Sequence, residues 1–110
     1  IPAFYNIFPE MNHNEIQGYD SKLSDNFCPI FITDSDDDER IQKRMFILKK
    51  QLDDKGIKTI NFEVEGETRL EKVMNSILLA DWFSYFIAIK NGVDPEEVSM
   101  IEDFKKELNK

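Results

Sequence analysis

The residues best suited to chemistry lie near the N-terminus, in the segment PEMNHNEI (residues 9–16). His13 is the only histidine in the 110 residues, and Asn12 and Asn14 stand on either side of it. Because the imidazole pKa lies near neutrality, histidine is the usual proton-transfer group at physiological pH. The amides offer hydrogen-bond donors and acceptors, and the Glu15 carboxylate could orient the imidazole. The pattern indicates an acid–base site. The structural alternative is a helix start capped by Asn12 or Asn14, with His13 merely exposed.

Two other groups of polar residues have ordinary structural interpretations. Asp81 and Ser84 interrupt the apolar run Ile77–Ile89, and a carboxylate in such a run needs a hydrogen-bonding or charged partner. That partner lies elsewhere in the fold or across an interface, or else the carboxylate is catalytic. Lys105 and Lys106 form an adjacent basic pair, and by pattern alone they belong to a solvated helix face near the favourable end of the helix dipole.

The acidic run Asp34–Glu39 imitates a calcium loop without meeting its requirements. Glu39 and Met45 occupy the sixth and twelfth positions, where such a loop needs glycine and glutamate. The carboxylates therefore predict a helix N-terminus, whose dipole favours negative charge. With one cysteine and one histidine, the chain also has too few of the usual ligands for a zinc site of its own.

Composition restricts the class of protein. A net charge of −8 argues against binding to nucleic acid and to an anionic membrane surface. The 41% hydrophobic content, with nine phenylalanines, is enough for a core. A length of 110 residues fits one domain at most. Cys28 is the only cysteine, which favours a reducing compartment, and no signal peptide is recognisable. The run Ile77–Ile89 is too short to span a bilayer.

A strand–helix–strand unit is expected in the first half of the chain. Residues 27–33 (FCPIFIT) read as a buried strand, residues 37–55 as a helix with an apolar stripe, and residues 57–64 as a half-buried strand. Gly56 is the expected helix stop. Such a unit predicts parallel strands with a right-handed crossover. Because a parallel sheet is usually covered on both faces, the unit is expected to be part of a larger doubly wound sheet.

The second half is predicted to be helical. Thr68 and Glu71 form a capping box for a helix over residues 69–91, which is followed by Gly92. Its later part is apolar on nearly every side, which predicts burial on more than one face. A further helix is expected to begin at once, with Asp94 as N-cap and Pro95 as the first helical residue.

Two blocks of the sequence resemble one enzyme family. PEMNHNEIQG (9–18) resembles the PELNHNEI-G segment of the archaeal and bacterial bifunctional phosphoglucose/phosphomannose isomerases, and ADWFSYFIAIKNGVDPEEVSMIEDFKKEL (80–108) resembles their C-terminal block. The resemblance implies a dimer whose subunits have two flavodoxin-like α/β SIS (sugar isomerase) domains. Residues 1–110 are similar to the later part of the second SIS domain only, so the chain is expected to be a piece of a longer protein, in keeping with its start at Ile1 rather than Met.

The family interconverts glucose 6-phosphate or mannose 6-phosphate with fructose 6-phosphate through an enediol. By resemblance, His13 opens the sugar ring in the neighbouring subunit's site, and Lys105 is the cation that contacts the sugar oxygens. Asn12, Asn14 and Glu15 match the rest of the motif and would bind substrate or position His13. Glu97 stands where many relatives have proline, so Lys106 remains the alternative to Lys105.

The resemblance also implies what these residues alone would not do. The enediol-forming glutamate and the Ser/Thr-rich phosphate loop fall outside them, so the 110 residues are expected to be inactive by themselves. No metal or organic cofactor is implied, and a cytoplasmic location is expected. The alternatives are a non-catalytic SIS-type regulatory domain that binds sugar phosphates, or a dimerisation module driven by the aromatic helix over residues 80–89.

Overall fold

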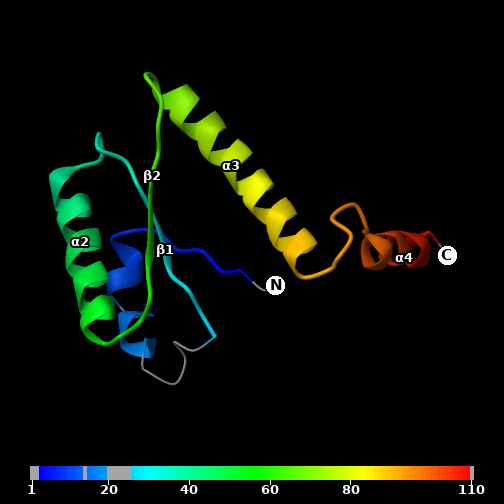
Figure 1. Cartoon of the computed structure of the whole chain (residues 1–110), viewed down its shortest axis with the longest axis horizontal. Helices are drawn as coiled ribbons and strands as arrows, with labels where there is room; N and C mark the ends of the chain where they lie inside the picture. The colour runs from blue at the N-terminus through cyan, green and yellow to red at the C-terminus, as the bar shows by residue number, and fades with distance from the viewer. Residues whose placement is uncertain (1–2, 14, 20–25, 110) are drawn as a thin grey trace. The chain divides into compact units, whose positions relative to one another are not determined.

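The computed structural model describes residues 3–13, 15–19 and 26–109 (Figure 1). It divides into two compact units, Ile1–Glu65 and Gly66–Lys110, hereafter unit 1 and unit 2. Each unit is described by itself. Within the described residues, the elements in chain order are the 3-10 helices η1 (Glu10–Asn12) and η2 (Glu15–Gly18), then β1 (Ile30–Thr33), α2 (Glu39–Asp54), β2 (Ile60–Glu63), α3 (Arg69–Lys90) and α4 (Ser99–Leu108).

Unit 1 contains the expected β1–α2–β2 arrangement. The two strands pair in parallel, with Ile30 opposite Ile60 and Thr33 opposite Glu63, which confirms an α/β fold with a small parallel sheet. Each strand is shorter than the sequence pattern predicts. Backbone bonds continue just beyond the strands, since Ile60 N–H donates to the Pro29 carbonyl at 2.9 Å and Val64 N–H donates to the Thr33 carbonyl at 2.8 Å. The backbone hydrogen bonding therefore reaches Pro29 at one end of the sheet and Val64 at the other.

The core of unit 1 lies between α2 and one face of the sheet. The predicted stripe of α2 supplies Met45, Leu48 and Leu52, which are buried with Phe31 of β1. Leu48 and Leu52 are only 2% and 1% exposed, and burying a side chain of this size contributes about 2 kcal/mol each. The other face of the sheet carries Ile30, Ile32 and Ile60, which are exposed.

The ends of α2 follow the predicted capping rules. Asp38 is the N-cap, and its Oδ1 accepts from Arg40 N–H at 2.9 Å. At the other end, Gly56 has φ +77°, a conformation that suits glycine. Gly56 N–H donates to the Asp53 carbonyl and Ile57 N–H to the Leu52 carbonyl. These two bonds form a Schellman motif, so the chain turns and Ile57 enters the core.

Helix α3 begins as predicted but is not buried as predicted. Thr68 Oγ1 accepts from Glu71 N–H at 3.2 Å, while the Glu71 carboxylate accepts from Thr68 N–H, so the capping box is confirmed. Trp82 and Phe86 stack at 5.7 Å but remain 53% and 60% exposed. Asp81 and Ser84 are exposed as well, so the expected burial is not formed within unit 2, and a partner for Asp81 across an interface stays a prediction. The physical reason is that unit 2 offers no second layer to cover an all-round apolar helix.

Within the described ranges, α3 is the single helix that is long and apolar enough to cross a membrane by length and composition. The sequence pattern had indicated that the run Ile77–Ile89 is too short to span a bilayer, because it counted only the continuous apolar run and not the whole helix. One such helix is weak grounds for a membrane location, because the core helices of soluble proteins pass the same test.

Helix α4 begins later than the sequence pattern predicts. Asp94 Oδ1 accepts from Glu96 N–H at 2.9 Å, and Glu97 N–H donates to the Asp94 carbonyl at 3.3 Å. These bonds close a separate turn, so Asp94 satisfies a local turn and not the helix. The N-cap of α4 is Val98, which makes no side-chain cap bond.

Candidate functional site

The histidine segment is held on unit 1 through its neighbours. Met11, in the middle of η1, is 8% exposed and belongs to the core cluster. The Phe8 ring lies 6.4 Å from the ring of Phe31. His13 closes the turn, with its N–H donating to the Glu10 carbonyl at 3.0 Å, and its side chain is exposed. An exposed imidazole therefore stands on an anchored 3-10 turn. Asn12 lies within this turn and does not cap it, and a capping role for Asn14 lies outside the described residues.

Asn12 connects this turn to α2. Its amide orientation follows from the surrounding hydrogen bonds, which place Oδ1 at 2.9 Å from Nη1 of Arg44 and the amide nitrogen within reach of the Pro9 carbonyl. Asn12 is half-buried. The Arg44 contact ties the residue beside His13 to a helix that carries the core.

The other predicted residues of the motif have different surroundings. The Glu15 carboxylate accepts from the side-chain amide of Asn6. Burial and then the Glu15 charge raise the pKa of Tyr19 above its ordinary value. Orientation of the His13 imidazole by Glu15 stays a prediction. Asn14 lies outside the described residues, so its predicted role is not addressed by the structure.

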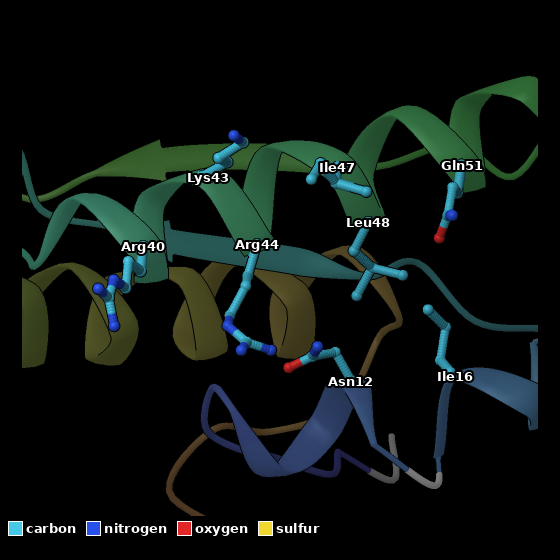
Figure 2. A pocket seen from close by; sticks show the side chains of 8 residues that line it. All are labelled: Asn12, Ile16, Arg40, Lys43, Arg44, Ile47, Leu48 and Gln51. Carbon is cyan, nitrogen blue, oxygen red and sulfur yellow. The ribbon is translucent and has the colours of Figure 1, made fainter.

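A groove of about 450 Å³ lies beside Asn12 (Figure 2). It is lined by three cationic side chains of α2 (Arg40, Lys43 and Arg44), by two amides (Asn12 and Gln51) and by three apolar side chains (Ile16, Ile47 and Leu48). The sequence pattern predicted only the apolar stripe of this helix. The spacing of four residues between Arg40 and Arg44 is the signal that could have indicated a common side.

A second groove, of about 270 Å³, has an acidic lining that includes Asp34, Asp37 and Glu63. Such a lining disfavours a phosphorylated ligand by charge repulsion. In the described ranges of the chain, no group of three or more His, Cys, Asp or Glu side chains is arranged to hold a metal ion.

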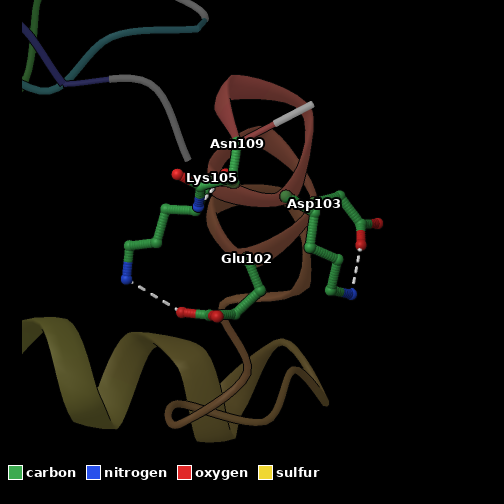
Figure 3. Close-up of polar contacts among 5 residues, drawn as sticks. Glu102, Asp103, Lys105 and Asn109 are labelled. Carbon is green, nitrogen blue, oxygen red and sulfur yellow. Dashed lines mark hydrogen bonds and ion pairs between the residues drawn. The ribbon is translucent and has the colours of Figure 1, made fainter.

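Lys105 and Lys106 lie on α4 of unit 2 and have different partners. Figure 3 shows Lys105 extending toward Glu102. Lys105 Nζ pairs with Glu102 at 2.9 Å, and Lys106 Nζ pairs with Asp103 at 2.9 Å. Both ion pairs are exposed, so each ammonium can exchange its carboxylate for another anionic or oxygen-rich partner at small cost. Because His13 belongs to unit 1, the convergence of His13 and Lys105 on one substrate stays a prediction.

Comparisons with known proteins give a consistent result. Residues 1–108 match the family model described as the bacterial phospho-glucose isomerase C-terminal SIS domain. The chain is 39% identical over 110 residues to a bifunctional phosphoglucose/phosphomannose isomerase of Aquifex aeolicus, covering 99% of this chain and 34% of that protein. It is 35% identical over 107 residues to the protein of the same name from Thermoplasma volcanium, covering 96% of this chain and 34% of the relative. The chain thus spans about a third of the length of these relatives. No solved structure matches the chain significantly.

Proposed function

Because the chain belongs to the family of bacterial phospho-glucose isomerase C-terminal SIS domains, we propose that it is part of an aldose–ketose isomerase acting on hexose 6-phosphates. The reaction is the interconversion of glucose 6-phosphate or mannose 6-phosphate with fructose 6-phosphate. The observation that carries the proposal is the family match over residues 1–108, which includes the exposed His13 on its anchored turn. The relatives are named as enzymes, which favours catalysis over a purely regulatory domain.

The proposed mechanism passes through an enediol, and each residue of this chain has a distinct role in it. His13 acts as general acid and base on the ring oxygen and opens the sugar ring. Its exposure supports the role, because a sugar can approach the imidazole. The Lys105 ammonium stabilises negative charge that develops on the sugar oxygens, a contribution that is largest where charge appears in the transition state.

Asn12, Asn14 and Glu15 are proposed to bind substrate or position His13. The bond between Asn12 and Arg44 supports a positioning role for Asn12. The proton transfer between C1 and C2 and the binding of the phosphate are assigned to residues of the longer protein outside this chain. No metal or organic cofactor enters the proposed mechanism.

The wider setting is also a proposal. The βαβ unit is proposed to belong to a flavodoxin-like, doubly wound SIS domain, and residues 1–110 to form the C-terminal part of a second such domain. The protein is proposed to act as a cytoplasmic homodimer in which His13 serves the neighbouring subunit's site. The small parallel sheet and the family match support the assignment to an SIS domain.

The test is His13→Ala in the longer protein that contains this chain. Loss of the ring-opening acid is expected to lower kcat with fructose 6-phosphate by roughly 10²- to 10⁴-fold, with a smaller change in KM. Gln17→Ala is the control, because Gln17 is an exposed side chain on the neighbouring η2 and lies outside the proposed roles. A His13→Ala enzyme with the kcat of the Gln17→Ala enzyme would remove His13 from the mechanism.

A further inference from the structure

Positive charge is concentrated in the groove beside Asn12, although the chain as a whole carries a net charge of −8. Two of the chain's three arginines, Arg40 and Arg44, line this groove together with Lys43. The two arginines are one helical turn apart on α2. Figure 2 shows both side chains extending toward the side of α2 where Asn12 lies, while Lys43 extends the other way.

The charge of these three side chains is not neutralised in the way that the charge of three other lysines is. Lys49, Lys105 and Lys106 each have a carboxylate partner on the same helix, within 2.7–2.9 Å. In contrast, across residues 3–13, 15–19 and 26–109, no carboxylate forms an ion pair with Arg40, Lys43 or Arg44. Like charges one turn apart on a helix repel each other. An anion bound between the two guanidinium groups would remove this repulsion.

The lining of the groove indicates the chemical class of that anion. A planar guanidinium fork matches phosphoryl oxygens in pairs, and two forks can serve a dianion. The Gln51 amide adds a neutral hydrogen-bonding group, and Ile16 and Ile47 offer apolar surface to a carbon skeleton. The volume of about 450 Å³ lies in the range of small-molecule sites.

We propose that this groove of unit 1 is a binding site for a phosphoryl group, held chiefly by Arg40 and Arg44. The group comes either from inorganic phosphate or from a small phosphorylated metabolite. Because Arg44 also donates a hydrogen bond to Asn12, an anion bound at Arg44 would change the surroundings of the residue next to His13. The site does not depend on the proposed isomerase activity, and its test needs no turnover.

Nitrogen-15 NMR of the 110-residue chain provides a direct test, because each of the three arginines contributes one Nε–Hε signal. Titration with inorganic phosphate, and separately with glucose 6-phosphate, is expected to shift the Arg40 and Arg44 signals in a saturable way. The Arg69 signal, from unit 2, is expected to stay in place. Potassium chloride at matched ionic strength is the control for simple screening.

A matched pair of variants completes the test. Arg40→Gln is expected to weaken the binding of phosphate at least tenfold, whereas Arg69→Gln, which removes the same charge elsewhere, is expected to change it less than twofold. Equal affinity for both ligands identifies free phosphoryl binding, and at least tenfold tighter binding of glucose 6-phosphate identifies an ester site. The proposal is overturned by equal shifts in chloride, by shifts of Arg69 that match those of Arg40, or by unchanged binding in Arg40→Gln.

Discussion

At the scale of single residues, comparing variants of Lys105 and Lys106, the two adjacent lysines of α4, distinguishes a catalytic role from a structural one. They have the same charge and equally short ion pairs, with Glu102 and Asp103 respectively. Only Lys105 is proposed to meet the sugar. In the longer protein, Lys105→Met is therefore expected to lower kcat/KM for fructose 6-phosphate by about 10²-fold, as for other lost groups that stabilise developing charge. Lys106→Met is expected to leave kcat/KM within twofold. The reverse order would assign the role to Lys106.

The contact between Arg44 and Asn12 leads to a second prediction at this scale, which concerns the free energy of unfolding. A hydrogen bond between them, half-buried on the Asn12 side, is expected to couple the two residues by about 1 kcal/mol. A double-mutant cycle with Arg44→Met and Asn12→Ala, followed by urea unfolding of the chain, measures this coupling. Lys43→Met with Asn12→Ala is the control cycle and should be additive. Additivity in both cycles would contradict the contact.

His13 was singled out by residue type, since it is the only histidine in the sequence, but its proposed role came from the resemblance of residues 9–18 to one enzyme family. The surroundings of Glu15 were not predictable in the same way. Its partner Asn6 is nine residues away, and the bond between them depends on how the chain folds back after Pro9. The arginine groove was missed for a similar reason, since its second wall comes from Asn12 and Ile16, far from α2 in sequence.

At the scale of elements, Gly56 shows how a local conformation sets a boundary. Its φ of +77° favours glycine, and an added Cβ would meet nothing within 4 Å. Gly56→Ala should therefore cost only conformational energy, about 1 kcal/mol of unfolding free energy. Urea denaturation of the chain measures the loss. Gly18→Ala, at a glycine outside the positive-φ set and also without close neighbours, is expected to be nearly neutral. Equal losses would mean that the Schellman turn does not govern the end of α2.

A helix end was predictable where the capping side chain can bond only to a backbone amide of the helix. It was not predictable where the same side chain can also bond to a backbone amide of a separate turn. Thr68 caps α3 as predicted because the backbone amide that it meets belongs to the helix itself. The acidic run was predicted to start a helix, and Asp38 caps α2 in the same way, although no single cap was predicted there. Asp94 has the same chemistry, but its carboxylate closes a turn with Glu96, and α4 starts only at Ser99. The sequence contains both possibilities, and tertiary context decides between them.

At the scale of the whole molecule, the two units differ in how they are stabilised. Among the described residues of unit 1, six apolar side chains are buried and form a core. Among the described residues of unit 2, the only buried side chain is that of Lys72. Trp82, Phe83 and Phe86 of α3 are at least half exposed. Apolar surface on this scale is a feature of interaction sites in folded proteins. The burial that the sequence predicted for α3 therefore needs contacts that unit 2 does not supply.

This difference bears on what the 110 residues can do alone. In the proposed mechanism, His13 opens the ring, but proton transfer between C1 and C2 needs a base assigned to the longer protein. Moreover, Lys105 lies in a unit without an apolar core, and a loosely held cation loses most of its effect on a transition state. The chain is therefore expected to show no turnover of fructose 6-phosphate above the buffer rate in a coupled assay, while the longer protein turns over under the same conditions. Circular dichroism of the same sample checks that its helices have formed. Measurable turnover by the chain would show that its own residues include the base, and the assignment of proton transfer to other residues would then be wrong.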